Sequence, residues 1–366
     1  RREMRDGSVR KRHSTERGQT WLLFEQLGGT AASLQLGRIA LIDRRAWWWD
    51  DDLDAIRLTL PMAQGRIETG VARELLKVAS VDNGIAPELR GLNRWFGHAT
   101  RAWGEGQQVE AFWLFQHDGS GAPAPGALFE DGRQDRSAAS LRWLGLRATG
   151  EKRWASGHRA LYRIDGAMLR GRETLTRFDE LKSGQWLAGR SSARRVRATA
   201  WDLGAQWRWP GAARPTISLG LARGSGGLDG TLDRRFRQTG LQENKARFAG
   251  VKRMRMYGEL LQPELSNLQV ASAGFGLRGL SNSSVEVLWH HYRQVEAAAE
   301  LAGSRLSSTP TGLDRRLGHE IDLLVALREW QHVELTLTLS AFHPGAAFGL
   351  RRDPAYGIEF GLTLTF

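Results

Sequence analysis

The 366-residue chain contains no cysteine, only four tyrosines, and no apolar run of about 18 residues. Without cysteine, disulfide bridges and thiolate metal sites are excluded. Without a long apolar run a transmembrane helix is excluded, although a membrane-spanning β-strand needs only about 10 residues of alternating character. The basic start of the chain is not followed by the apolar stretch of a signal peptide, so we expect an exported protein to carry its leader outside this sequence.

Motifs for catalysis and metal binding are also missing. His290 and His291 are adjacent and face opposite sides of a strand, so they form no metal pair. The glycine-rich stretch 224–227 lacks the lysine and the strand-to-helix context of a phosphate-binding loop. The acidic run "DDDLD" at 50–54 offers oxygen ligands for Ca²⁺, but it lacks the glycine and the distal glutamate of an EF-hand loop. We therefore expect neither an enzyme nor a cofactor or resident metal.

Tryptophan, glycine and positive charge are abundant. The chain has 15 tryptophans, 43 glycines and a net charge of +12, with arginine far more common than lysine. Tryptophan favours membrane interfaces and glycine favours turns and close strand contacts. A strongly basic chain implies an anionic partner, for which nucleic acid, a lipid headgroup and an acidic polysaccharide all qualify.

The chain ends in "YGIEFGLTLTF", in which apolar residues occupy every second position from Ile358 to Phe366. The same period of two recurs at 196–209, 318–330 and 332–342. This period is typical of a β-strand with different surroundings on its two faces. The apolar face would meet a core in a soluble protein and lipid in a membrane barrel.

Connections between about fifteen such strands alternate between short and long. The long ones are 39–53, 74–94, 117–139, 171–195, 223–266, 293–317 and 343–356. Such alternation indicates an all-β, antiparallel transmembrane β-barrel, with short turns at the periplasmic rim and long loops outside. Tryptophans near strand ends are expected in its interfacial girdles rather than in a core: Trp95, Trp103, Trp154, Trp207, Trp209, Trp289 and Trp330.

Several stretches resemble the alginate-export family of outer-membrane porins. They are "LQLGRIALIDRRAWWWDDDLDAIRL" at 34–58, "FRQTGLQENKARFAG" at 236–250, "YGELLQPELSNLQVASAGFGLR" at 257–278 and the weaker "WHHYRQ" at 289–294. The resemblance runs through nearly the whole chain. It implies a barrel of about 18 strands in the outer membrane of a Gram-negative bacterium, which exports an anionic polysaccharide such as alginate. It further implies contacts with outer-membrane lipid and lipopolysaccharide, the barrel-assembly machinery and a periplasmic scaffold lipoprotein, but not with nucleic acid, and a monomeric barrel.

We expect a single barrel domain over residues 1–366. Since an antiparallel barrel cannot close with an odd number of strands, we expect about 15–16 of the family's strands in this chain and the first strands before residue 1. The terminal Phe366 resembles the C-terminal signal that assembly machinery recognises. The resemblance would also imply a pore occluded by a long periplasmic turn as well as by an external loop. None of the short turns here is long enough to plug a barrel, the longest being 150–158, so this property does not transfer directly.

A lumen lined with guanidinium groups would lower the barrier for a string of carboxylates, because arginine can meet a carboxylate with two hydrogen bonds. Acidic residues between the arginines would weaken each contact with the polymer enough for the polymer to move on. Alternatively, these arginines and acids form a salt-bridge lattice that only stiffens the barrel wall. Strand alternation selects the lumen candidates Arg38, Arg57, Arg66, Arg142, Arg163, Asp165, Asp202, Arg208, Glu320, Asp322, Arg328 and Glu359.

Two loops supply gate candidates. In the first, Trp47, Trp48 and Trp49 would stack on sugar rings over the pore or else anchor the loop at the headgroup interface, with Arg44, Arg45, Asp50, Asp51, Asp52 and Asp54 fixing it by ion pairs. The second loop is the longest and either folds against the inner wall or forms an external lid. Its candidates are Arg237, Arg247, Glu259, Glu264 and Asn267.

Two other functions remain open at this point. The first is a general anion-selective porin for small solutes, which shares the barrel but not the polymer. The second is a soluble, basic all-β protein that binds glycan or nucleic acid, in which the apolar strand faces would form a core.

Overall fold

The computed structural model describes residues 2–3, 9–10, 14–80, 84–86, 89–119, 121–129, 137–181, 185–280, 282–350 and 352–365. Within these ranges, no helix has the length and apolar character needed to cross a membrane. Two short 3₁₀ turns lie wholly within the described residues, η1 (Leu27–Gly29) and η3 (Ala346–Phe348). The remaining elements of the described residues are β-strands, apart from a 3₁₀ residue at Leu89.

One sheet of 18 strands dominates the described chain. Its long strands are β3 (Thr20–Phe24), β4 (Ser33–Ile42), β5 (Asp50–Met62), β6 (Gly65–Ala72), β7 (Leu92–Gly104), β8 (Gln107–Asp118), β10 (Ser137–Arg153), β11 (Arg159–Glu180), β12 (Trp186–Arg208), β13 (Thr216–Gly224), β18 (Leu268–Leu277), β19 (Ser284–Gln294), β20 (Arg316–Trp330), β21 (Val333–Pro344) and β22 (Ala355–Leu364). Short strands are β1 (Arg2–Glu3), β2 (Val9–Arg10), β9 (Leu128–Phe129), β14 (Leu228–Asp229), β15 (Leu232–Asp233), β16 (Lys245–Ala246) and β17 (Met254–Arg255).

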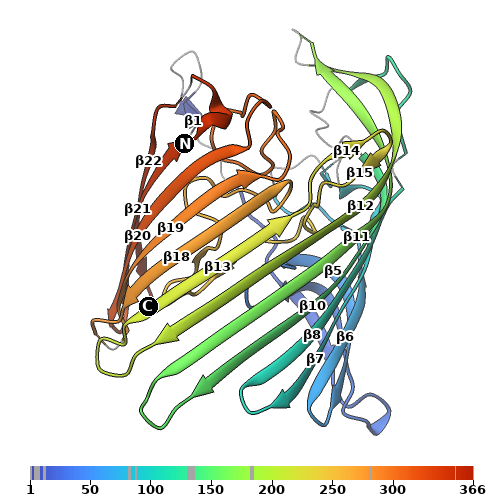
Figure 1. The fold of residues 1–366 in the computed structure, drawn as a ribbon. Coiled ribbons are helices and arrows are strands. Elements are labelled where there is room, and N and C mark those ends of the chain that lie inside the picture. Colours follow the sequence, from blue (N-terminus) through green and yellow to red (C-terminus); the bar gives the residue numbers. More distant parts are fainter. Residues whose placement is uncertain are drawn as a thin grey trace.

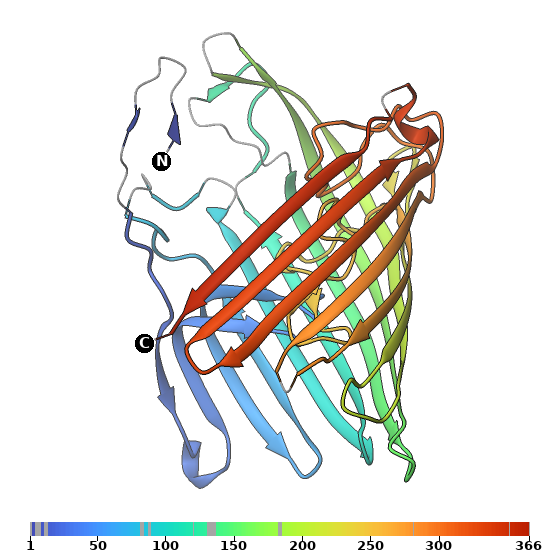
Figure 2. The ribbon, with the colours of Figure 1, turned by 90° about the vertical axis from the view of Figure 1, so that its left-hand side faces the viewer.

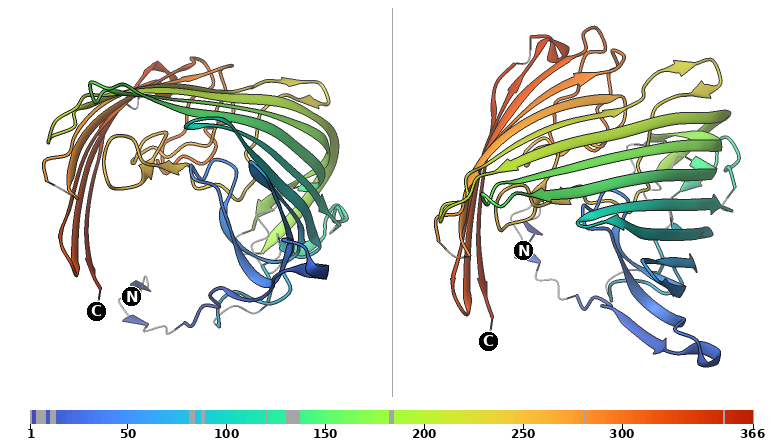
Figure 3. Two further views of the ribbon diagram at one scale, coloured as in Figure 1. Left: turned by 90° about the horizontal axis from the view of Figure 1, so that it is seen from below. Right: turned by 60° about the horizontal axis from the view of Figure 1, so that its bottom comes forward.

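The long strands pair antiparallel in chain order from β3 to β22. The short strands β9, β14 and β15 join the same sheet, whereas β1 with β2 and β16 with β17 form two separate two-stranded sheets. Tilted strands wrap around a central space, and long segments of the chain lie inside it (Figures 1, 2 and 3). This arrangement confirms the predicted all-β barrel architecture. In a tilted antiparallel sheet that curls in this way, neighbouring strands satisfy each other's backbone hydrogen bonds.

The predicted alternation of short and long connections is present. Turns such as 63–64, 105–106 and 331–332 lie at one rim, and connections such as 225–267 and 295–315 lie at the other. The predicted loop at 171–195 is wrong in extent, because β11 and β12 continue through most of it and leave only 181–185 between them. The reason is that Glu173 and Phe178 keep facing inward, so the ladder is maintained almost to the turn.

The outer face of the sheet is apolar and exposed. On β22, Tyr356, Ile358, Phe360, Leu362 and Leu364 are all between 51% and 79% exposed. Five of the girdle tryptophans, Trp95, Trp103, Trp207, Trp289 and Trp330, are exposed as well, which contradicts a role in a core. An apolar belt of this size on the outside of a barrel fits contact with lipid.

The buried core lies inside the barrel, where two connections fold inward. One is the tip of the β4–β5 hairpin, residues 43–49, and the other is residues 225–267 between β13 and β18. Their aromatic and aliphatic side chains pack against inward residues of the wall, such as Phe112, Leu114 and Trp143. The barrel is therefore filled on one side by its own loops rather than by wall side chains alone.

Candidate functional site

The tip of the β4–β5 hairpin carries three consecutive tryptophans into the lumen. Trp47, Trp48 and Trp49 are each no more than 3% exposed. Trp48 stacks on Phe112 of β8 at a centroid distance of 4.9 Å. The wall makes room for it at Gly145 of β10, where a Cβ atom would collide with the Trp48 ring. An anchor in the headgroup interface is therefore wrong for these residues, and their burial also leaves no ring face free for stacking on sugars.

Asp43 organises this tip. Its carboxylate accepts hydrogen bonds from the backbone N–H groups of Trp47 and Trp48 at 3.1 Å, and from that of Arg45 at 3.2 Å. It also pairs with Arg147, whose Nη2 lies 2.8 Å from Oδ2. Burial by itself would raise the pKa of Asp43, but the charge and hydrogen bonds of Arg147 and the backbone donors lower it to about 2.

A buried ion network joins the tip to the wall. Arg147 of β10 binds Asp165 of β11 through Nε at 2.5 Å. Arg45 of the tip binds both Asp165 and Asp202 of β12, the latter at 2.9 Å. Arg163 lies 3.7 Å from Asp202. The cations Arg45, Arg147 and Arg163 match the carboxylates Asp43, Asp165 and Asp202, so this set of six carries no net charge and locks the hairpin in place. Glu110 of β8 lies 4.0 Å from Arg147 and is paired with His98 at 2.8 Å.

The segment 225–267 folds against the inner wall, so the lid alternative is wrong. Glu320 of β20 accepts hydrogen bonds from the backbone N–H groups of Leu260 and Leu261 at 2.7 and 2.9 Å. Glu286 of β19 accepts one from Ala249 at 2.8 Å, and Asp322 accepts a long one of 3.4 Å from Glu259. Inward carboxylates of the wall thus satisfy backbone donors of an irregular buried segment.

The two inward segments also hold each other. The Tyr257 hydroxyl donates to Asp202 at 2.8 Å and accepts a hydrogen bond from Trp47 Nε1 at 2.8 Å. The Asp50 backbone N–H donates to the Leu241 carbonyl at 2.6 Å. The segments therefore form one constricting unit in the lumen.

Most of the remaining predicted residues also face inward. Three wall candidates form ion pairs: Arg66 with Glu68 at 3.4 Å, Arg328 with Glu334 at 2.5 Å, and Glu359 with Lys252 at 3.9 Å. Two others form hydrogen bonds with neutral side chains: Arg57 with Gln35 at 2.5 Å and Arg208 with Thr216 at 3.3 Å. Two loop candidates form ion pairs: Arg237 with Glu173 at 2.5 Å and Asp50 with Arg253 at 3.1 Å. Three others form hydrogen bonds with the backbone. Glu259 accepts one from the Arg255 N–H at 3.0 Å, the Glu264 N–H donates to the Ala302 carbonyl at 2.9 Å, and the Asn267 side chain donates to the Glu296 carbonyl at 2.8 Å.

Asp50 and Asp54 are thus occupied by arginines rather than arranged around a cation site, since Asp54 pairs with Arg17 at 2.6 Å. No group of three or more histidine or acidic side chains in the described part of the chain is placed to hold a metal ion. Phe366 lies outside the described residues.

Two lumen predictions are wrong. Arg142 lies on the outer face of β10, because Trp143 and Leu141 turn inward to pack on the folded-in segments while Leu144 and Leu146 are exposed. Arg38 shares its face with Leu36, and its pair with Glu74 at 3.0 Å lies on that outer side. The arginine of β10 that faces inward is Arg147, which was not among the predicted lumen residues. The signal for it was Trp143, four residues earlier on the same face.

A basic cavity of about 530 Å³ lies beside the constricting unit, toward the rim of short turns. Arg44 and Arg247, from the two inward segments, line it together with Arg45 and Arg163, and Gln107 and Gln206 add amide groups from the wall. The acidic side chain in the lining, Glu151, is paired with Arg153 and Arg159. Arg44 and Arg247 are exposed, and among the described residues neither has an acidic partner. This cavity therefore offers unpaired guanidinium groups, which can bind carboxylates reversibly at the lumen surface.

Comparisons with known proteins agree on the family. Residues 5–358 match the family model described as alginate export. The chain is 26% identical over 300 residues to the alginate production protein AlgE of Pseudomonas aeruginosa, covering 80% of this chain and 59% of that protein. It is 23% identical over 308 residues to AlgE of Azotobacter vinelandii, covering 79% of this chain and 60% of that protein.

The chain thus spans about three fifths of the length of these curated relatives. Among solved structures, the outer membrane protein OprD from Pseudomonas aeruginosa is similar with a TM-score of 0.50 and 13% identity, covering 91% of this chain and 74% of that one. At this identity the similarity concerns the fold alone. The chain belongs to the alginate-export family and has the fold of an outer-membrane β-barrel.

Proposed function

We propose that the chain forms a conduit in the outer membrane of a Gram-negative bacterium for an anionic polysaccharide, alginate or a related polyuronate. The observation that carries this proposal is the basic cavity beside the constricting unit, with the unpaired Arg44 and Arg247 in its lining. Family membership supplies the class of polymer. No covalent step is part of the proposal.

The proposed mechanism is electrostatic. A polyuronate carries one carboxylate per sugar, and moving it into a narrow lumen costs desolvation and self-repulsion. Exposed arginines at the narrow point offset both costs, because they attract the polymer and replace part of its hydration. The neutral network beneath them, in which Arg147 is fully paired, takes no part in binding and holds Arg44 at the tip in position.

The test is the ion selectivity of single channels in a planar bilayer under a salt gradient. We expect the wild type to be anion-selective, and Arg44→Gln combined with Arg247→Gln to shift the reversal potential toward zero. Arg223→Gln is the control, because Arg223 is exposed on the outer face of β13. A reversal potential that is the same in the double variant and in the wild type would contradict the role of the cavity.

A further inference from the structure

The outer face of β10, β11 and β12 carries a row of arginines where the apolar belt ends. Arg142 lies opposite Arg170, and Arg170 lies opposite Arg197, in the registers of three adjacent strands. One row nearer the rim of long loops, Arg172 lies opposite Arg195. All five side chains are exposed. We call these five residues the outer arginine cluster.

Within the part of the chain that the structure describes, the positive charge of this cluster is not offset by ion pairs. Like charges directly opposite each other on neighbouring strands destabilise a sheet. Among the described residues, no acidic side chain pairs with any of the five. The row directly below them holds Leu144, Met168 and Thr199, so the cations stand at the boundary of the lipid-facing surface. An arrangement that costs stability in the free protein is expected where an anion binds between the charges.

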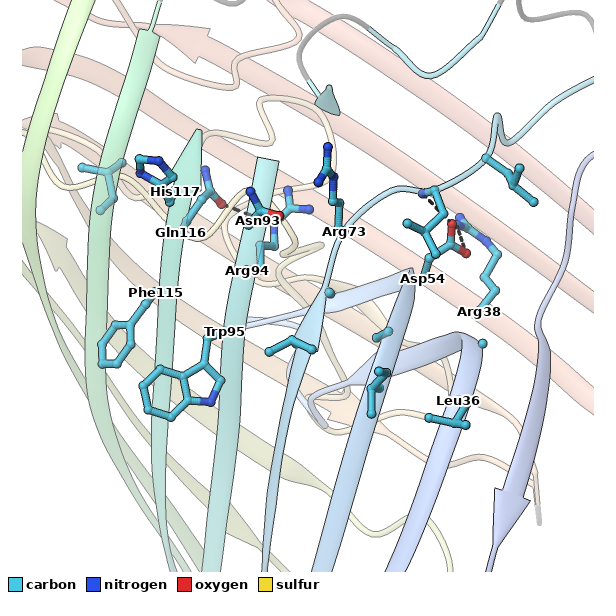
Figure 4. A pocket seen from close by; sticks show the side chains of 18 of the residues that line it. Leu36, Arg38, Asp54, Arg73, Asn93, Arg94, Trp95, Phe115, Gln116 and His117 are labelled. Carbon is cyan, nitrogen blue, oxygen red and sulfur yellow. Dashed lines mark hydrogen bonds and ion pairs between the residues drawn. The ribbon is translucent and has the colours of Figure 1, made fainter. Parts of the chain in front are cut away.

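An apolar groove adjoins the cluster. A cavity of about 1210 Å³ on the outer face is lined by Arg142 together with Ile56, Val71, Trp95 and Phe115. The Arg142 guanidinium lies over the Phe115 ring, 6.0 Å from its centroid. Figure 4 shows the Trp95 and Phe115 rings on one side of this groove and polar side chains, including Asn93, His117 and Arg73, on the other.

One end of the groove is closed by ion pairs that together carry no net charge. Arg17 binds Asp54 with two hydrogen bonds of 2.6 and 2.9 Å, and Arg38 binds Glu74 at 3.0 Å. Two cations here meet two carboxylates, in contrast to the outer arginine cluster at the opposite side of the groove. Away from this end, the charged side chains among the described lining residues are Arg73, Arg94 and Arg142, next to a floor made of apolar and aromatic side chains.

We infer that this surface binds an anionic lipid of the outer leaflet, a phosphorylated glycolipid, with its phosphates among the outer arginine cluster and an acyl chain in the groove over Trp95 and Phe115. The assignment rests on the part of the proposed function that places the barrel in an outer membrane, and not on the exported polymer. The long-loop rim faces the outside in such barrels, so the cluster lies at the level of the outer-leaflet headgroups. Arginine forks match phosphate oxygens, and a phosphate between opposed arginines removes their repulsion.

The test is native mass spectrometry of the full chain, purified in a non-ionic detergent and titrated with bis-phosphorylated lipid A. Arg142→Gln combined with Arg170→Gln is expected to weaken binding about tenfold, because two charge-assisted contacts are lost. The matched control is Arg223→Gln combined with Arg293→Gln. These two arginines are also exposed and outward-facing, but Gln269 of β18 separates them. The control is expected to stay within about twofold of the wild type.

Two further arms separate lipid from free anion. The variant Arg142→Gln/Arg170→Gln is called the cluster variant. Dephosphorylated lipid A should bind to the wild type no better than to the cluster variant. Inorganic phosphate at millimolar concentration should not displace the phosphorylated lipid from the wild type. Equal affinities of the wild type and the cluster variant would overturn the assignment. Displacement by inorganic phosphate would overturn it in favour of a simple anion site.

Single-channel currents of the same variants test the lipid site independently of the proposed polysaccharide conduit. The variant Arg142→Gln/Arg170→Gln should conduct with the selectivity of the wild type, since both arginines are exposed on the outer face that also carries Leu144 and Met168. Heat-modifiable migration on a gel confirms that the variant is folded. A selectivity that changes along with lipid affinity would contradict the placement of these arginines on the outer face.

Discussion

At the residue scale, arginine has three different roles in this chain, and the surroundings decide which. Arg147 is 2% exposed and lies between Asp43 and Asp165, so its charge is cancelled by its contacts. Arg44 and Arg247 face the basic cavity without acidic partners in the described part of the chain. Arg142 and Arg170 stand on the outer face. A net charge of +12 does not distinguish these roles, because they differ in burial and in partners rather than in number.

Removing Arg147 is predicted to be strongly destabilising. Arg147→Met would leave two buried carboxylates without their shared cation, which costs about 3–5 kcal/mol in the free energy of unfolding. Urea unfolding in detergent, followed by tryptophan fluorescence, measures it. The exposed Arg223→Met should change the same quantity by no more than about 0.5 kcal/mol. A loss below about 1 kcal/mol for Arg147→Met would show that the network does not hold the hairpin.

Acid is predicted to weaken the hairpin tip through Asp43. Its pKa in the folded protein is about 2, below the ordinary value of 3.8, so the ionised form stabilises the fold above about pH 4. That contribution, about 2 kcal/mol, is lost as the pH falls from about 4 to about 2. Asp43→Asn lacks it at every pH. The difference in unfolding free energy between wild type and variant should therefore shrink across this window, and a constant difference would contradict the paired state of Asp43.

At the element scale, the strands could be predicted from sequence but the inward segments could not. Period-two alternation marks a strand such as β22 and separates its two faces. It does not say which face points inward once apolar residues are needed on both sides. On β10, Trp143 faces inward and packs on the folded-in segments, while Leu144 is exposed on the outer face. Arg142 shares the face of Leu144, so its predicted position in the lumen is wrong.

Contacts of the inward segments span long stretches of chain. Arg45 reaches Asp165 across 120 positions, and Thr239 bonds the Trp48 carbonyl across 191. Local patterns carry no information on such pairs, because each partner is an ordinary polar residue in its own neighbourhood. The sequence could therefore single out the residues of both segments but could not choose between a lid and a filling of the lumen.

The β4–β5 hairpin is predicted to depend on one glycine of the wall. Gly145→Ala would place a methyl group within the Trp48 ring, and the hairpin tip must move to accommodate it. We expect a loss of about 1–3 kcal/mol in stability and a larger single-channel conductance. Gly166→Ala on β11 is a matched control, since a Cβ there meets nothing within 4 Å. Equal conductance of the two variants would show that the tip does not narrow the lumen.

At the scale of the whole molecule, the barrel presents arginines on two separate surfaces. Its outer surface carries an exposed apolar belt with arginines at the boundary, and its lumen holds a constricting unit with arginines on its exposed side. The buried ion network lies between these surfaces and is neutral. Polymer transport and lipid binding are therefore expected to respond to different substitutions.

Block of the single-channel current by an oligouronate tests the proposed conduit most directly. Added to the side of the short turns, the oligomer should reduce the wild-type current in proportion to its occupancy of the basic cavity. A neutral oligosaccharide of equal length should have no effect at the same concentration. Arg44→Gln combined with Arg247→Gln should require a substantially higher oligouronate concentration for half-block. Anion-selective currents that the oligouronate leaves unchanged would contradict a polyuronate conduit.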